Sequence, residues 1–300
     1  MMIVETVRLH WLLGALALAT TPVPGQQKVD ARVAVTRDVH VRINGAFGEL
    51  RVTGWEKDSL VLTGLLPKDA RLDGMGGMGG GPPAKGLKFY IEGSSRPGGA
   101  SGSLELFVPF GATVWAKSGS ARIAVQGVTG GLDLNIVGGS ITVTGNPREL
   151  NVESMDGAVE VTGAPVWMRA KTATGAIVLR GSCTDAGVTT VAGAVTLRDG
   201  TFERTRIETV TGDVTFAGAV ARAGSLTIDS HSGTISMHVG AGASVDVEAT
   251  TIIGDILNSV TSRRPAPGRE GRGAELTLTL GTGDAHATLR SFKGNIRLTR

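Results

Sequence analysis

The stretch 139–218 decides the fold, because it holds five versions of one short pattern: GSITVTG (139–145), GAVEVTG (157–163), GAIVLRG (175–181), GAVTLRDG (193–200) and GDVTFAG (212–218). The first glycines of these versions follow one another at steps of 18, 18, 18 and 19 residues. A short, nearly fixed period is typical of stacked repeats and not of a single globular core. The period therefore says much about architecture and little about biochemical activity.

Each unit has the alternation of a strand with one buried face. Apolar residues stand two and four positions after the first glycine, as Ile141 and Val143 do, and Thr142 lies between them. A further apolar residue five positions before the glycine, such as Leu134, indicates a second strand. We therefore expect two short strands per unit, joined at a turn where glycine tolerates unusual backbone angles. Stacking such units buries one continuous apolar column.

The period extends in both directions from these five units. Upstream, Gly119 lies 20 residues before the first unit, with its strand shifted by two positions. Downstream, glycines follow at positions 233, 254 and 294, and the last of them introduces a closing strand that contains Leu298.

We predict an all-β chain that folds as a single-stranded parallel β-helix, or β-solenoid, with coils of about 18–21 residues. The left-handed hexapeptide helix is excluded because it needs an aliphatic residue every six positions. A propeller blade is excluded because it needs about 40 residues or more.

Composition supports a narrow stack. Glycine supplies 45 of the 300 residues and aromatic residues only 4%. The net charge of +3 is too small to indicate a nucleic-acid partner. The single cysteine, Cys183, rules out an internal disulfide, and its place at a coil corner favours a structural thiol over a nucleophile.

Residues 1–25 resemble a secretory signal peptide. Arg8 precedes the apolar run 11–19, and the small residues Val23 and Gly25 fit the cleavage positions. No later segment is long and apolar enough for a transmembrane helix. We therefore expect a mature protein that is exported to the periplasm, the cell surface or the medium.

The rest of the chain divides into three parts. Residues 26–64 are expected to form N-terminal strands or a cap of the solenoid, and residues 65–103 a glycine-rich loop with one strand at 87–91. The glycine-rich run lacks the Gly-Lys-Ser/Thr ending of a phosphate-binding loop. Residues 104–300 hold the repeats, interrupted by a basic loop at 261–273 with Arg263, Arg264, Arg269 and Arg272. This loop either contacts an anionic polymer or lipid, or is simply solvated.

The recurring unit resembles the DUF4097 family, a group of bacterial proteins that carry the label of adhesins. The resemblance rests on the units at 155–161 (MDGAVEV), 210–216 (VTGDVTF) and 231–237 (HSGTISM), and on the opening GELRVTGW at 48–55. It covers nearly all of the mature chain and implies a β-solenoid without an established enzymatic activity. Fold by itself does not supply a function.

Carboxylates deserve attention because parallel β-helices also host polysaccharide lyases and glycosidases. Asp213 and Asp255 both follow a turn glycine, with Thr234 at that position in the coil between them. Two coil spacings place their backbones about 9.6 Å apart, near the upper limit for an inverting acid–base pair. Asn295 occupies the same position near the end, and Ser140 an equivalent one. The alternative is that all of them bond their own turns.

We predict no catalytic residue, no metal site and no cofactor. His231 and His238 flank one strand and are expected about 20 Å apart. His40 and His286 have no acidic or histidine neighbour at ligand spacing. No nucleophile, base and orienting group converge in the repeat register.

What remains is a row of outward side chains that could bind an extended polymer or a protein: Thr142, Glu160, Arg180, Thr196, Arg198, Thr215 and Ser236. Three hypotheses follow. The first is a cell-envelope adhesion or scaffold module whose partner is a surface polysaccharide or an envelope protein. The second is a carbohydrate-active enzyme built on Asp213 and Asp255. The third is a spacer that forms homo-oligomers end to end through open coil edges, and that Leu298→Lys would keep monomeric.

Overall fold

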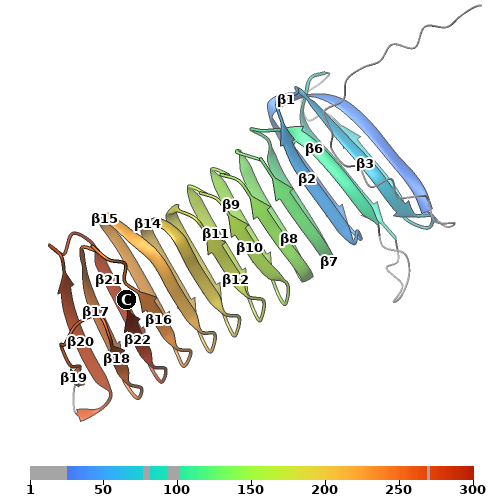
Figure 1. Ribbon diagram of the computed structural model, residues 1–300. Helices are drawn as coiled ribbons and strands as arrows, with labels where there is room; N and C mark the ends of the chain where they lie inside the picture. Colours follow the sequence, from blue (N-terminus) through green and yellow to red (C-terminus); the bar gives the residue numbers. More distant parts are fainter. Residues whose placement is uncertain (1–25, 77–81, 94–101, 269–270) are drawn as a thin grey trace, which may run out of the picture.

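The computed structural model describes residues 26–76, 82–93, 102–268 and 271–300. These residues contain no α-helix, and none of them forms a helix capable of crossing a membrane. The expectation of an all-β chain is confirmed. Figure 1 shows the strands stacked side by side in one long row, which follows the order of the chain in its middle part, from β7 to β15. The predicted signal peptide lies outside the described residues.

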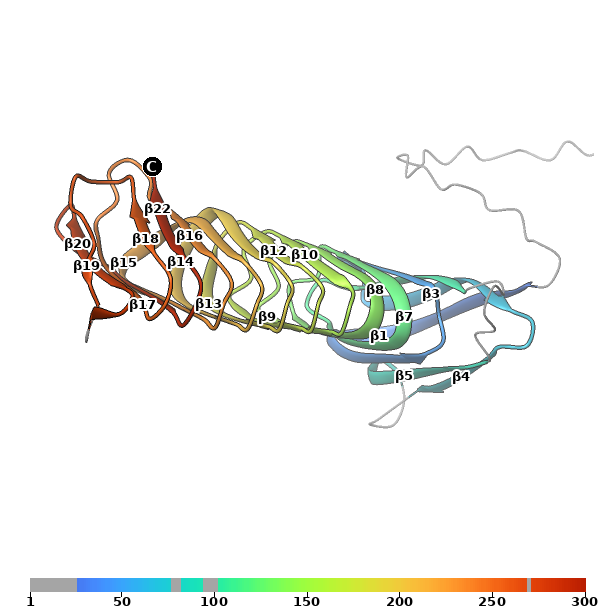
Figure 2. The same cartoon turned by 90° about the horizontal axis from the view of Figure 1, so that it is seen from below.

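Successive coils contribute strands to two columns, which we call face 1 and face 2; Figure 2 shows them as the two long sides of the stack. In spatial order, face 1 contains β4 (Arg71–Gly76), β5 (Ala84–Glu92), β1 (Gln26–Gly45), β7 (Thr113–Gln126), β8 (Gly131–Thr144), β9 (Glu149–Ser154), β11 (Trp167–Thr172), β13 (Cys183–Thr190), β14 (Val195–Thr209), β15 (Val214–Ser230), β21 (His286–Ser291), β17 (Val245–Thr251), β20 (Ala274–Leu280) and β19 (Ala266–Pro267).

Face 2 contains, in spatial order, β3 (Ser59–Pro67), β6 (Ser103–Pro109), β2 (Glu49–Trp55), β7, β8, β10 (Ala158–Thr162), β12 (Ile177–Arg180), β14, β15, β16 (Ile235–His238), β22 (Ile296–Thr299) and β18 (Ile256–Asn258). The long strands β7, β8, β14 and β15 run through both faces. Pairing between neighbouring coils is parallel throughout the middle of the stack.

The predicted alternation places the core between the two faces. On face 2, Val159 pairs with Ile141 and Ile177 in the neighbouring coils, and all three side chains are fully buried. On face 1, Val152 and Ala170 pair and are equally buried. Each added coil therefore extends one apolar column, which is the main stabilising contribution in a stack of this kind.

The turn between the faces depends on a glycine and a buried hydroxyl. The backbone N–H of Gly193 donates to Thr190 Oγ1 at 3.0 Å, and Thr172 Oγ1 donates to the carbonyl of Gly175 at 2.7 Å. A Cβ on Gly193 would lie 2.1 Å from the carbonyl oxygen of Gly175 in the preceding coil. The turns therefore stack closely only because no side chain stands at this position.

The predicted step of 20 residues from Gly119 to Gly139 was wrong. Gly139 pairs with Ala121, so the turn position of the preceding coil is Ala121 and the step is 18 residues. Gly119 lies two residues earlier, where an added Cβ would meet no atom within 4 Å. This offset accounts for the strand that seemed shifted by two positions.

The last coil in the sequence is not the last coil in space. Strand β22 pairs with β16 on one side and with β18 on the other, and β21 lies likewise between β15 and β17 (Figure 1). Leu298 is fully buried in this interior coil. The expectation that Leu298 lies on an open end is therefore wrong, and Leu298→Lys would damage folding instead of reporting on assembly.

The first coil in the sequence likewise lies inside the stack. Strand β1 lies between β5 and β7, and β2 lies between β6 and β7. At both ends, then, the outermost coil comes from the second or the second-to-last coil of the sequence. The first and last coils of the described chain are hydrogen-bonded on both sides, which protects these two coils from fraying.

Antiparallel strands finish both ends. At one end β3 pairs with β1 and β6, and β4 pairs with β5; at the other, β20 pairs with β17 and β19. The segment 65–103 therefore contains two strands, β4 and β5, where one was expected, and β5 joins the stack. Most of the glycine-rich run, 77–81, lies outside the described residues, as do 94–101. In the basic segment 261–273, β19 pairs with β20, while 269–270 are not described.

Candidate binding faces

The outward row of face 2 lies where the alternation predicts. All seven of its residues are exposed or half-buried, from Thr142 near one end to Ser236 near the other. Neighbouring coils pair their side chains, as Glu160 and Arg180 do at 3.8 Å. The row is a ladder of side chains that follows the stack, and an extended partner would lie along it.

The proposed carboxylate pair is separated by the interior last coil. Asp213 Oδ1 accepts a hydrogen bond from the Thr234 N–H at 2.8 Å, and Asn295 Oδ1 accepts one from the Asp255 N–H at 2.9 Å. The order along the turn is therefore 213, 234, 295 and 255, with three coil spacings between the aspartates, about 14 Å. The expected separation of two coils was wrong, and the real one exceeds that of an acid–base pair.

The histidines lie apart. The ring of His231 packs against Phe292 with 5.1 Å between centroids, whereas His238 Nδ1 lies 2.8 Å from Thr299 Oγ1. His286 does have an acidic neighbour, since its Nδ1 lies 3.9 Å from Asp246 Oδ2. That contact contradicts the expectation and arises because β21 lies beside β17. Within the described ranges, no three histidine, cysteine or acidic side chains are grouped as metal ligands.

Cys183 is a buried free thiol. Burial raises its pKa to about 11. A thiol with so high a pKa is protonated at neutral pH and is a poor nucleophile. This agrees with the structural role expected for it.

Face 1 carries a closely connected polar cluster. Arg169 Nη1 donates to Asp185 Oδ1 at 2.7 Å, and Arg204 Nε donates to Asp185 Oδ2 at 3.2 Å. The Arg169 guanidinium also lies over the ring of Trp167, 4.4 Å from its centroid, and its stem covers Gly187. A side chain at Gly187 would collide with it, so the glycine leaves the space that Arg169 occupies.

The pairing of Asp185 predicts a pH dependence of stability. Burial raises the pKa of Asp185, but the hydrogen bonds from Arg169 and Arg204 outweigh it, so the pKa lies below the usual 3.8. A carboxylate with a lowered folded pKa stabilises the fold above its unfolded pKa, and that stability is lost as pH falls through the folded value. Asp185→Asn should therefore lower the unfolding free energy at neutral pH by about 1 kcal/mol and by much less at about pH 3. Urea unfolding of both proteins at the two pH values measures this. If the variant lost as much unfolding free energy at about pH 3 as at neutral pH, the pairing of Asp185 with the two arginines would be contradicted.

One row of side chains was missed by the sequence interpretation. It stands two residues before each turn glycine, is largely apolar and yet faces solvent, and we call it the apolar edge: Val137, Met155, Ala173, Val191, Val210, His231, Phe292 and Ile252 in spatial order. Its large apolar members are 43–55% exposed. The signal was present in the sequence, because the pattern before the glycine reads Ser/Thr, apolar residue, any residue, Gly in most coils.

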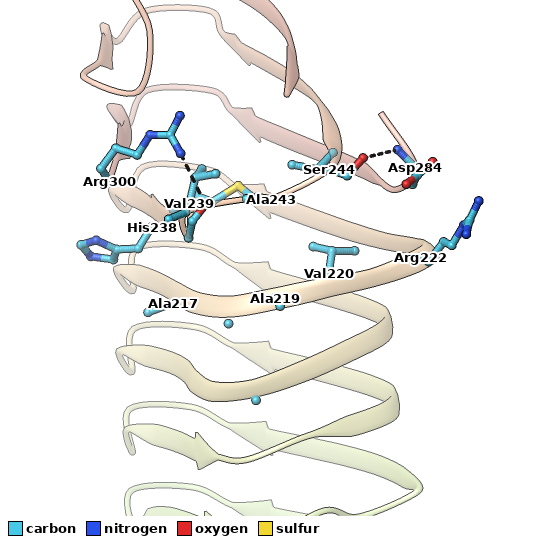
Figure 3. A pocket seen from close by; sticks show the side chains of 17 residues that line it. Ala217, Ala219, Val220, Arg222, His238, Val239, Ala243, Ser244, Asp284 and Arg300 are labelled. Atoms are coloured by element: carbon cyan, nitrogen blue, oxygen red, sulfur yellow. Dashed lines mark hydrogen bonds between the residues drawn. The ribbon is translucent and has the colours of Figure 1, made fainter. Parts of the chain in front are cut away.

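A hollow of about 520 Å³ lies near the C-terminal end, where β15 continues around the coil but the next coil has the loop 239–244 instead (Figure 3). Its lining is mostly small: Gly200, Ala217, Gly218, Ala219, Gly240, Ala241, Gly242 and Ala243 contribute. Figure 3 shows Arg222 and His238 at opposite ends of the hollow, while Ser244 accepts a hydrogen bond from the Asp284 N–H. No group of polar side chains converges there.

Comparison with known proteins identifies the family. The model of the Toastrack DUF4097 family matches residues 29–299. Among solved structures, the chain is similar to a proposed adhesin of Bacteroides fragilis NCTC 9343 (10% identity, 91% of this chain and 97% of that one, TM-score 0.46). It is also similar to a proposed cell adhesion protein of Clostridium sporogenes ATCC 15579 (8% identity, 92% and 99%, TM-score 0.22).

A third structure, a proposed lipid-binding protein of Parabacteroides distasonis ATCC 8503, has 12% identity and a TM-score of 0.37 over 92% of this chain and 98% of that one. No curated protein matches the chain in sequence. Similarities at this level transfer no function. The extent of the family match nevertheless settles membership: the chain belongs to the Toastrack DUF4097 family.

Proposed function

We propose that this chain is an exported, non-catalytic binding or scaffold protein of the bacterial cell envelope, a β-solenoid whose face 1 holds an extended polymer. The proposal rests on the surface of the stack itself. The outward side chains repeat at the spacing of the strands, about 4.8 Å, over the whole length of the stack. An extended ligand with its own short repeat can match such a surface at many positions at once.

One observation favours face 1 over face 2. Two tryptophans stand outward on face 1, each covered by a guanidinium: Arg42 lies 4.7 Å from the centroid of Trp115, and Arg169 lies 4.4 Å from that of Trp167. Strands β8 and β9 separate them, so the two pairs are about 14 Å apart along the stack. Tryptophan and arginine supply most of the energy at many binding surfaces. Two such pairs at different points on one flat face suit an elongated ligand.

The test is binding to an array of cell-wall, capsular and plant polysaccharides, with the release of reducing ends followed in the same wells. We expect binding without release. The double variant Trp115→Ala/Trp167→Ala should weaken binding by at least about tenfold. The matched control changes a pair on face 2, Glu160→Gln/Arg180→Gln, and should bind like the unchanged chain.

The other outcomes are equally informative. Release of reducing ends that Asp213→Asn abolishes would contradict the proposal and support a lyase or glycoside hydrolase. If only the face 2 variant weakened binding, the binding role would stand but the binding site would lie on face 2. Absence of both binding and release would contradict the proposal that the ligand is a polymer. The remaining hypotheses would then be a protein partner or a structural spacer.

A further inference from the structure

The apolar edge defined above runs along much of the stack. It crosses eight consecutive coils from Val137 to Ile252, a length of about 34 Å. Seven of the eleven exposed large hydrophobic residues of the described chain lie on it or directly beside it. Exposed apolar surface gathered in one contiguous row marks an interaction site more often than scattered residues do.

Charged side chains accompany the edge on both sides. On the face 1 side, the outward row four residues before each turn glycine reads, in spatial order, Asn135, Glu153, Lys171, Thr189, Glu208, Asp229, Arg290 and Thr250. Glu208, Asp229 and Arg290 line one shallow hollow together with His231 and Phe292 of the edge, which shows that the two rows adjoin. On the other side, Asp156 and Lys293 follow directly after edge residues.

The charges of the face 1 row are complementary to those of the same row in the opposite direction. If the row is reversed and laid against itself, Glu153 comes opposite Arg290 and Lys171 opposite Asp229. The same reversal on the other side of the edge brings Asp156 opposite Lys293. Every charged residue that meets a charge in these rows therefore meets one of the opposite sign.

The same reversal also matches the edge with itself. Val191 comes opposite Val210 at the centre, and Met155 comes opposite Phe292 farther out. These apolar side chains would be shielded from water by their counterparts, which is the favourable term in association. An arrangement in which each patch meets a second copy of itself is the geometry of a two-fold dimer.

We propose that two copies of this chain associate along their apolar edges, antiparallel and related by a two-fold axis between Val191 and Val210. Other registers are disfavoured by charge. A shift by one coil loses the three opposite-sign pairs and brings Glu153 opposite Asp229, which is offset only by Lys171 opposite Glu208. A shift the other way also loses them, and it brings Lys171 opposite Arg290 and Glu208 opposite its own copy. In a parallel arrangement, the face 1 row of one copy would meet the row on the other side of the edge in the second copy. Arg290 would then lie opposite Lys293, which has the same charge. Charge pairs at the rim of an interface contribute mainly to this choice of register.

The first test is sedimentation of the purified full chain over a range of concentrations. We expect a monomer–dimer equilibrium that Val191→Asp shifts to monomer, with the dissociation constant raised by at least about tenfold because each new carboxylate would be buried against the apolar side chain of Val210 in the other copy. The matched control is Val166→Asp, at a residue that is also 50% exposed but lies off the edge. It should dimerise like the unchanged chain.

Charge reversal tests the register itself. Lys171→Glu should weaken the dimer, because the new carboxylate faces Asp229 of the second copy, and the double variant Lys171→Glu/Asp229→Lys should restore it. Far-ultraviolet circular dichroism confirms that each variant is folded. A chain that stays monomeric at its highest soluble concentration would overturn the proposal. So would a dimer that withstands Val191→Asp, or a double variant no better than Lys171→Glu.

Discussion

Gly193→Ala will lower the free energy of unfolding by more than about 2 kcal/mol, because the new methyl group cannot be accommodated without separating two coils. Its Cβ would lie 2.1 Å from the carbonyl oxygen of Gly175 and 2.9 Å from Thr190 Oγ1. The nearest of these atoms belongs to the backbone of the stacked turn in the preceding coil, where the carbonyl of Gly175 already accepts a hydrogen bond from Thr172, so it cannot move as a flexible side chain can. Urea unfolding followed by circular dichroism measures the effect.

Gly119 provides the matched control. An alanine Cβ there would meet no atom within 4 Å. Gly119→Ala should therefore change the unfolding free energy by no more than about 0.5 kcal/mol, with stabilisation expected where alanine restricts the unfolded chain. Equal losses in Gly193→Ala and Gly119→Ala would mean that the stacked turn is not what requires glycine at 193.

Leu298→Lys will lower the free energy of unfolding by at least about 3 kcal/mol. Leu298 is fully buried in β22, where it pairs with Met237 on one side and Asn258 on the other. An ammonium group at this position would lose its hydration, and no acidic side chain of the neighbouring strands β16 and β18 is present to compensate. Thermal and urea unfolding measure the loss.

The control for this prediction is one residue away. Arg297 stands outward on the same strand, so Arg297→Lys keeps an exposed cation and should leave stability unchanged within about 0.5 kcal/mol. A fully stable Leu298→Lys variant would show that β22 is an outer strand, as the order of the sequence suggests. The interior position described here would then be wrong.

The middle of the fold could be predicted because local signals agree there. Alternation at Ile141 and Val143 identifies the buried side, and the 18-residue step aligns each coil with the next. The order of the terminal coils could not be predicted, because the same local signals recur in every coil and do not distinguish one neighbour from another. Ile296 and Ile256 both stand two positions after a turn glycine and begin a short strand, so the pattern alone does not determine which of them lies beside Ile235.

The errors about candidate sites follow from this ambiguity. The separation of Asp213 and Asp255 was counted in sequence order, and the inserted coil adds one spacing. The contact between His286 and Asp246 joins residues 40 positions apart that only the coil order brings together. The apolar edge was a different failure. Its residues stand outside the alternating positions that identify the buried side, so the pattern gave no expectation for them.

The order of the C-terminal coils is the central claim, since the separation of the aspartates and the register of the dimer both depend on it. The most direct measurement is disulfide formation between outward positions of face 2. Ser236 pairs with Arg297, and Arg297 pairs with Leu257, so Ser236 and Leu257 are two strands apart, about 9.6 Å. A disulfide requires Cα atoms within about 7 Å.

The two variants to compare are Ser236→Cys/Arg297→Cys and Ser236→Cys/Leu257→Cys, each oxidised under mild conditions and mapped by mass spectrometry of non-reduced peptides. We predict an intramolecular disulfide in the first variant and free thiols in the second. A disulfide in the second variant and none in the first would place β18 directly beside β16 and contradict the account.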